Sequence, residues 1–186
     1  MLWRFLLLYL VSALTGTGCD WLHVRSDVLS YPQPFYPGGQ AVWVPFLFGA
    51  AGPVLVLQSV LLRKWWPAPA ASPTDLLTTL TGFVLAYLST TWLQAQPLAL
   101  LALLVITWGL HSWLRRDRGL WGYALLVACG GCLFEGTLAA TGAFVYRQPQ
   151  FYHVPIWLFG LYLHAALLTR TLAALYFTKP SAEQAL

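Results

Sequence analysis

Charged residues are scarce in this chain of 186 residues, because Asp, Glu, Lys and Arg together make up only 9% of it. Soluble domains carry about 25% charged residues. Hydrophobic residues amount to 59%, and a soluble protein of this length lacks the polar surface to cover them. The composition therefore excludes a soluble globular domain and predicts an integral membrane protein, whose solvent is the bilayer.

Cysteine is also rare, with Cys19, Cys129 and Cys132 as the three examples. This number does not make a secreted disulfide framework. Cys129 and Cys132 form a C-x-x-C pair, which leaves thiol redox chemistry open as a minor hypothesis beside ordinary packing. The sequence contains no phosphate-binding glycine loop, no G-x-S-x-G and no H-E-x-x-H. We predict no cofactor and no metal site.

Long apolar stretches dominate what remains, and each approaches the roughly 20 residues that cross a bilayer as a helix. A segment rich in proline and glycine, residues 25–40, separates the first two stretches and cannot stay helical. The fold class is therefore all-α, a polytopic membrane protein with a bundle of six transmembrane helices in one domain. We interpret the first stretch as a retained helix and not as a signal peptide. The predicted helices are residues 3–24, 41–62, 75–93, 98–114, 120–146 and 155–178.

The formal net charge of +4 is a property of the loops and does not indicate a nucleic-acid partner, because there is no soluble domain with a basic stripe. The loops on one side hold only Arg25 and Arg147. By the positive-inside rule both termini are predicted to be cytoplasmic, at the endoplasmic reticulum of a eukaryote or the plasma membrane of a bacterium. The basic residues on the side of the termini are Arg4, Arg63, Lys64, Arg115, Arg116, Arg118 and Lys179.

Two ionisable residues stand deep in the last two apolar stretches, Glu135 before the connecting turn and His164 after it. In antiparallel helices they lie at similar depth, so we expect that they can pair. An unpaired ionisable group in hydrocarbon costs at least about 3 kcal/mol, so both should face the interior. Three roles stay open: a structural hydrogen bond, a polar contact to a ligand, and acid–base catalysis. Gly142 shares the small-sided face of Glu135, which allows close packing or leaves room for a ligand.

Asp20 and His23 form a second pair, spaced i and i+3 near the end of the first helix. One interpretation is a solvated helix end at the interface. The other is the polar mouth of a cavity whose deeper polar contact is Glu135. Metal binding is weakly supported, because no motif fixes the geometry of these side chains. The hydroxyl residues predicted to lie at the same end of the bundle are Ser89, Thr90 and Thr91.

Three stretches resemble the insulin-induced gene protein (Insig) family of six-helix membrane proteins. Residues 43–45 (WVP) are similar to the family's WWVPP, and residues 115–119 (RRDRG) are similar to its FDRSRSG loop. The third stretch is similar to the family's GVYQYTSPDFLYVRSWL in residues 142–146 (GAFVY) followed by Pro149, Phe151, Val154, Trp157 and Leu158.

The resemblance implies a non-enzymatic bundle that binds a lipid, a sterol in the animal proteins, in a central membrane cavity. Animal members also retain partner membrane proteins in the endoplasmic reticulum. The family's acidic residue implicated in partner binding falls near Leu114, with Asp117 close by, and its arginine in the last helix has a counterpart in Arg170. Glu135 and His164 have no match in the family's pattern. The resemblance therefore supports lipid binding by this protein more strongly than it supports regulation of a partner protein.

We accordingly predict a non-enzymatic membrane protein that holds a lipid, such as a sterol, a diacylglycerol or an isoprenoid-like molecule, between its helices. Regulation of a partner membrane protein and formation of an oligomer are further expectations. The alternative is an intramembrane enzyme that acts on an isoprenoid or sterol-like lipid with Glu135 and His164 as acid and base. The residues predicted to bind the ligand are Asp20, His23, Glu135, Gly142, Trp157 and His164.

Overall fold

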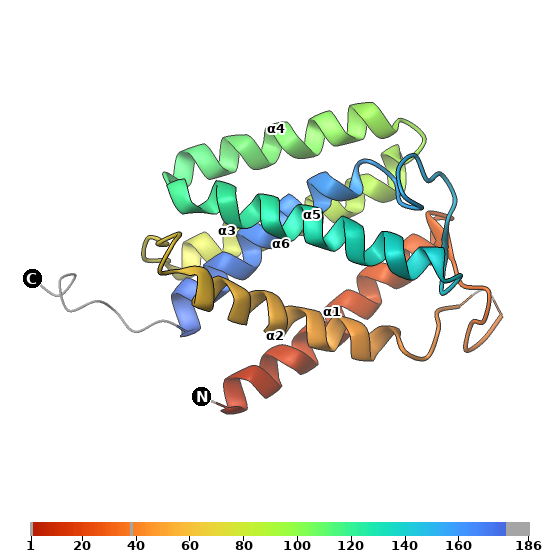
Figure 1. Ribbon diagram of the computed structural model, residues 1–186, viewed down its shortest axis with the longest axis horizontal. Coiled ribbons are helices and arrows are strands. Elements are labelled where there is room, and N and C mark those ends of the chain that lie inside the picture. The colour runs from red at the N-terminus through yellow and green to blue at the C-terminus, as the bar shows by residue number, and fades with distance from the viewer. Residues whose placement is uncertain (1, 38, 178–186) are drawn as a thin grey trace, which may run out of the picture.

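The computed structural model describes residues 2–37 and 39–177, and this part of the chain forms a bundle of six helices (Figure 1). Each is long and apolar enough to cross a membrane, when the π-helical continuation η1 (Ala173–Phe177) is counted with α6. Two short strands, β1 (Leu29–Ser30) and β2 (Val145–Tyr146), pair antiparallel. The prediction of an all-α membrane bundle is thus confirmed. The helices are α1 (Leu2–Arg25), α2 (Val44–Leu62), α3 (Pro73–Leu93), α4 (Pro97–Arg115), α5 (Arg118–Ala140) and α6 (Leu158–Leu172).

The predicted helix bounds agree closely with the structure except around the turn between the last two helices. We predicted that the fifth helix extends to residue 146, and this is wrong. It ends at Ala140, because Gly142 takes a left-handed conformation with φ of 80° and donates its N–H to the carbonyl of Ala139 at 2.9 Å. The sixth helix begins at Leu158 and not at 155. Residues 178 and 179, including Lys179 of the charge argument, lie outside the described residues.

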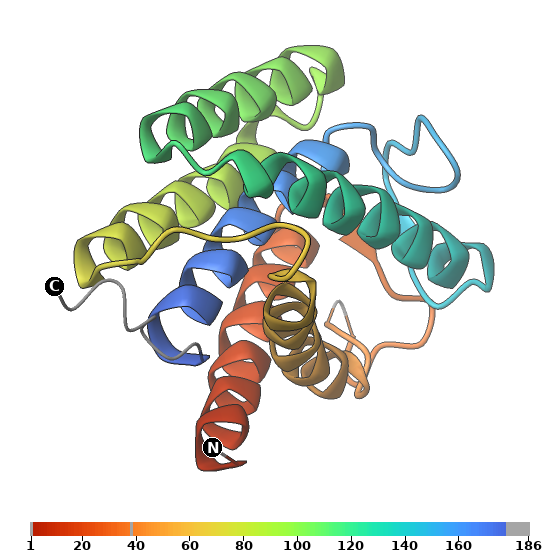
Figure 2. The ribbon, with the colours of Figure 1, turned by 60° about the vertical axis from the view of Figure 1, so that its left-hand side comes forward.

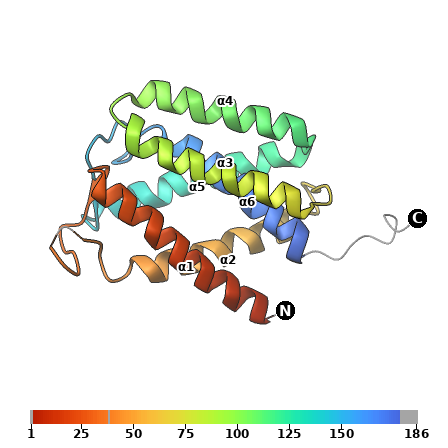
Figure 3. The same cartoon turned by 180° about the vertical axis from the view of Figure 1, so that it is seen from behind.

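Helix α6 is the centre of the bundle, and α2, α3, α4 and α5 all pack against it (Figure 2). Ten of its fifteen residues are buried, whereas α1 buries only Asp20 and His23. α1 packs mainly on α2 and crosses the outside of the bundle, as the view from behind shows (Figure 3). α6 is thus the most enclosed helix, and its buried side chains include His164 and Arg170.

The described ends of the chain lie together at one end of the bundle. The rings of Phe5 and Phe177 are 4.7 Å apart, and Arg4 donates to the carbonyl of Tyr176. The α2–α3 and α4–α5 loops lie at this same end, which we call the Arg-rich end (Figure 1). The α1–α2, α3–α4 and α5–α6 loops lie at the opposite end, which we call the loop end.

A buried ion pair joins three elements at the Arg-rich end. Asp117 caps the start of α5 by accepting the N–H of Leu120, and it accepts two hydrogen bonds from Arg170 of α6, at 2.7 and 2.9 Å. Nη2 of Arg170 also donates to the carbonyls of Trp66 and Pro67 after α2. Both charged side chains are almost fully enclosed. A charge buried in this way has to be paired, so the contact holds α5, α6 and the end of α2 together.

This geometry yields a prediction about stability. Asp117→Asn should lower the free energy of unfolding in detergent by about 3 kcal/mol, because it leaves the buried guanidinium of Arg170 without a counter-charge. Asparagine keeps the helix cap, so the loss reports the charge. Asp27→Asn is the matched control, since Asp27 pairs with Arg147 at the exposed loop end and such pairs contribute about 1 kcal/mol or less. Equal losses of unfolding free energy in the two variants would contradict the role of Asp117 as the counter-charge of Arg170.

Candidate functional site

The end of α1 places Asp20 under the proline- and glycine-rich loop that follows it. The loop returns over the helix, so that the hydroxyl of Tyr31 donates to Asp20 at 2.9 Å and the amide of Gln40 donates to it at 2.7 Å. Gln40 also donates to the carbonyl of Thr17. Burial, followed by the nearby Asp20 charge, raises the pKa of Tyr31, so its phenol stays protonated and remains a donor. Asp20 is only 4% exposed, so the interpretation as a solvated helix end is wrong.

His23, one turn further on, is bound to α3 through both ring nitrogens. Nε2 lies 2.7 Å from the hydroxyl of Thr90, and Nδ1 lies 3.0 Å from the hydroxyl of Tyr87. The Thr90 hydroxyl donates its own proton to the Tyr87 carbonyl, so it accepts from Nε2–H, and Nδ1 accepts from Tyr87. The imidazole also stacks on Tyr87 and meets the edge of Trp157. Every polar atom of this ring is thereby occupied by a protein partner.

Glu135 of α5 is held by two phenols, one on each carboxylate oxygen. Tyr146 of β2 donates to Oε2 at 2.5 Å, and Tyr162 of α6 donates to Oε1 at 2.6 Å. Gly131, one turn before Glu135, allows this approach, since a Cβ there would lie 2.5 Å from the Tyr162 ring. Burial and the adjacent Glu135 charge raise the pKa of Tyr146, which keeps it a donor. Glu135 is partly exposed as a residue, and each carboxylate oxygen can accept one more hydrogen bond than the one it receives from its phenol.

An aromatic cluster connects these three polar groups. The edge of Tyr146 faces Trp157 at 6.2 Å, and Trp157 in turn contacts His23. Phe144 lies between Tyr31 and Tyr146. Asp20, His23 and Glu135 therefore surround a single cluster at the loop end, with partners from α3, α6, β2 and the loop after β1. The pairing of Leu29 with Tyr146 and of Ser30 with Val145 fixes the two loops against each other.

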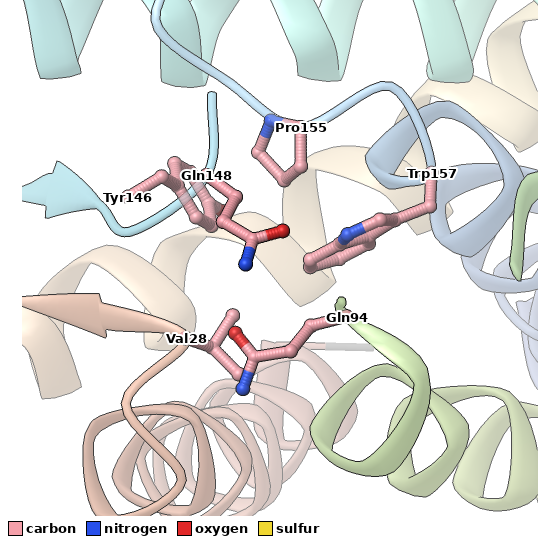
Figure 4. A pocket seen from close by; sticks show the side chains of 6 residues that line it. All are labelled: Val28, Gln94, Tyr146, Gln148, Pro155 and Trp157. Atoms are coloured by element: carbon pink, nitrogen blue, oxygen red, sulfur yellow. The ribbon is translucent and has the colours of Figure 1, made fainter. Parts of the chain in front are cut away.

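A shallow recess opens from the loop end onto this cluster (Figure 4). Gln148 and Gln94 lie on opposite sides of it, with Trp157 beside them. The Gln94 amide donates to the carbonyl of Ser26, which ties the end of α3 to the end of α1. The side chains that line the recess are Val28, Gln94, Tyr146, Gln148, Pro155 and Trp157.

One face of α6 is left partly exposed by its neighbours and begins close to Glu135. It is flanked by α5, through Gly131 against Tyr162, and by α2, whose Leu55 and Leu62 pack against the same apolar cluster. We call this face the α6 stripe. Its residues recur every three or four positions, which places them on one side of the helix. They are Phe159, Tyr162, Ala165, Leu168 and Leu172.

His164 does not pair with Glu135, contrary to our expectation. Its Nε2 donates to the carbonyl of Leu104 at 3.0 Å and lies 3.3 Å from the hydroxyl of Thr107, both on α4. His164 follows Tyr162 by two positions, which is roughly 200° around a helix. Tyr162 therefore faces α5 while His164 faces α4. The positions of the two residues around their helix axes therefore separate them.

The remaining predicted residues have clear positions. Gly142 is exposed in the turn that ends α5, and nothing lies within 4 Å of where its Cβ would be. Trp157 is 1% exposed and packs inside the aromatic cluster. Cys129 is exposed, Cys132 is half-buried, and both are free thiols. Within residues 2–37 and 39–177, no group of three or more His, Cys, Asp or Glu side chains is arranged to hold a metal ion.

Sequence reasoning missed the tyrosines that satisfy the polar groups, above all Tyr146 and Tyr162. It also missed the pairing of Asp117 with Arg170. A usable signal existed in each case. A carboxylate in an apolar helix needs donors, and tyrosine brings a hydroxyl on an apolar ring to the same depth. An arginine within an apolar stretch likewise needs an acid at its own end of the bundle.

Comparison with known proteins supports the fold. No family model and no curated protein matches the sequence. Among solved structures, the chain is similar to MvINS, a mycobacterial Insig homolog from Mycobacterium vanbaalenii, with a TM-score of 0.81 and 23% identity over 94% of each chain. The fold is Insig-like. A cross-linked trimer of an arginine-to-cysteine variant of MvINS matches with a TM-score of 0.80, again at 23% identity over 94% of each chain. The resemblance is thus confirmed for the fold.

The site geometry predicts which residues are energetically coupled. In a double-mutant cycle, Glu135→Gln and Tyr162→Phe should be non-additive by about 1 kcal/mol or more, because the first removes the charge that strengthens the hydrogen bond and the second removes its donor. Glu135→Gln and His164→Gln should be additive within about 0.5 kcal/mol, because they share no partner. Unfolding free energies in one detergent provide both values. A coupling of Glu135 to His164 as large as that to Tyr162 would refute the arrangement.

Proposed function

We propose that this protein is a non-enzymatic membrane protein that holds a neutral lipid along the α6 stripe, with the lipid's hydroxyl group bound to Glu135. The observation that supports it most directly is the position of Glu135, a partly exposed residue whose carboxylate is held by Tyr146 and Tyr162 close to the start of the α6 stripe. Two phenols hold the acceptor in place before any ligand arrives. Such pre-organisation lowers the cost of binding.

The chemistry of the site favours a lipid with a free hydroxyl over a charged one. A carboxylate accepts hydrogen bonds and repels phosphate, so a sterol, a diacylglycerol or an isoprenoid alcohol complements it. The apolar side chains of the α6 stripe, together with Leu55 and Leu62 of α2, provide the surface against which rings or acyl chains pack. Both ring nitrogens of His23 are occupied by Thr90 and Tyr87. Asp20 is 4% exposed, and its Oδ2 accepts from Tyr31 and Gln40. Glu135 is partly exposed, so we assign the ligand's polar contact to Glu135.

The enzymatic alternative is not favoured by the geometry. It requires Glu135 and His164 to act on one substrate. The side chain of Glu135 faces α6, whereas that of His164 faces α4. Regulation of a partner membrane protein and cytoplasmic termini remain parts of the proposal that rest on the family resemblance and on the positive-inside rule. Assembly of several copies is proposed by analogy with the cross-linked MvINS trimer.

The test compares two ligands that differ only at the hydroxyl. Dioleoylglycerol should raise the thermal unfolding midpoint of the purified protein, whereas the same lipid with its hydroxyl acetylated should raise it much less. A hydrogen bond to a charged group contributes about 1.5–3 kcal/mol, so the two affinities should differ about 10- to 100-fold. Glu135→Gln should remove most of this difference. His164→Gln is the matched control, because it lies in the same membrane region and faces α4.

Equal stabilisation by both lipids in the wild type, or an unchanged difference between them in Glu135→Gln, would refute the role of Glu135. The lipid should also be recovered chemically unchanged after prolonged incubation, which mass spectrometry can check. Recovery of a product that depends on Glu135 would instead favour the enzyme.

A further inference from the structure

A second candidate site lies at the Arg-rich end, where α5 begins, whereas Glu135 lies toward the other end of that helix (Figure 1). A groove of about 540 Å³ opens there between the α2–α3 loop and the start of α5. Its volume is within the range of small-molecule sites, roughly 300–1,000 Å³. Its lining residues are Trp65, Trp66, Pro67, Ala68, Pro69, Arg116, Asp117, Arg118 and Gly119.

The groove carries excess positive charge. Arg116 and Arg118 are exposed on its wall, and within the described part of the chain no acidic side chain forms an ion pair with either guanidinium. Asp117 is the one acidic residue in the lining, and its two oxygens are bound to Arg170 beneath the groove. The ion pair thus neutralises the one acidic side chain in the groove's lining. Lys64 adds a further cation beside the groove, with its ammonium 3.9 Å above the Trp65 ring.

The helices that end around the groove indicate its depth in the membrane. α2 ends at Leu62 and α5 begins at Arg118, so the groove lies just beyond the apolar spans. Trp65 and Trp66 stand next to it, and tryptophan is enriched where a bilayer meets water. The groove therefore opens at the depth of lipid headgroups, where a phosphodiester is the abundant anion.

The backbone at Arg116 adds a separate observation. This residue ends α4 in a left-handed conformation, with φ of 53° and its N–H bonded to the carbonyl of Trp113. Glycine or asparagine usually occupies such a position, because a larger side chain is strained there. The arginine side chain is thus kept beside the groove at a cost to local stability. Strain of this kind at a binding surface is typical of a residue retained for contact with a ligand.

We propose that this groove binds the phosphate of an anionic membrane phospholipid, with Arg116 and Arg118 as its direct partners. Arginine suits this role because its planar fork donates two parallel hydrogen bonds to phosphate. Lys64 supports the charge from the rim, and Trp65 and Trp66 pack against the glycerol and the upper acyl chains. The site is distinct from the α6 stripe, where the Glu135 carboxylate repels an anionic headgroup.

The test measures which lipid the protein retains. Purified protein is equilibrated with equal amounts of phosphatidylglycerol and phosphatidylcholine in detergent, and bound lipid is counted by native mass spectrometry. The wild type should retain phosphatidylglycerol in preference. Each basic residue near a membrane surface strengthens anion binding about five-fold, so Arg116→Gln with Arg118→Gln should lower the preference about 25-fold. Arg147→Gln, at the loop end, is the control and should leave it unchanged.

Arg116→Gly separates binding from folding. It removes the left-handed strain, so the thermal unfolding midpoint should stay equal or rise, while retention of phosphatidylglycerol falls about five-fold. A lower midpoint together with unchanged retention would show that Arg116 acts on the fold alone and would overturn the proposal. Unchanged preference in the double variant would overturn it as well.

Two further measurements distinguish the source of the anion and the two proposed sites. Inorganic phosphate at the concentration of the lipid should not displace phosphatidylglycerol, because it lacks the glycerol and acyl contacts with Trp65 and Trp66. Full displacement would show a phosphate site without lipid specificity and would refute the proposal. The double arginine variant should keep its stabilisation by dioleoylglycerol, so failure at the groove is distinguishable from failure at Glu135.

Discussion

Hydrocarbon offers no hydrogen-bond partner, and this constraint decides where the polar side chains of the bundle lie. α6 is the helix most enclosed by others, and three of its polar side chains bind partners outside the helix. Tyr162 donates to Glu135 of α5, His164 donates to a carbonyl of α4, and Arg170 pairs with Asp117 at the start of α5. Apolar packing alone specifies such contacts weakly, because lipid tails are as apolar as leucine. The polar contacts therefore fix the rotation and depth of α6.

The sequence was sufficient for the number of spans, because length and hydropathy depend on each stretch by itself. It was also sufficient to show that Glu135 needs a partner inside the bundle. It was insufficient for the identity of that partner, because a shift of two residues turns a side chain to the other side of a helix. The end of α5 was missed for another reason. Residues 145–146 leave the helix to pair with β1, and such pairing depends on a loop more than a hundred positions away.

Asp20 and Arg170 also have partners that the sequence alone does not identify. The partners of Asp20 come from a loop that folds back over its own helix, and local sequence does not reveal that path. For Arg170 the choice is narrower, since Asp75 and Asp117 are the acids beside the same end of the bundle. Asp75 is engaged by Ser72 in a reciprocal cap at the start of α3. The sequence therefore reduces the search for a partner to very few residues, and tertiary structure makes the final selection.

The pairing of β1 with β2 has a consequence for biogenesis. Tyr146 is aligned with Leu29 by this pairing, and it is one of the two donors that hold Glu135. Spans enter a membrane in chain order, and the second donor, Tyr162, belongs to the last of them. The carboxylate is therefore satisfied only when the first, fifth and sixth spans are all inserted. A nascent chain that lacks the sixth span leaves one oxygen of this buried acid without its donor, so the last span completes the polar contacts of the fifth.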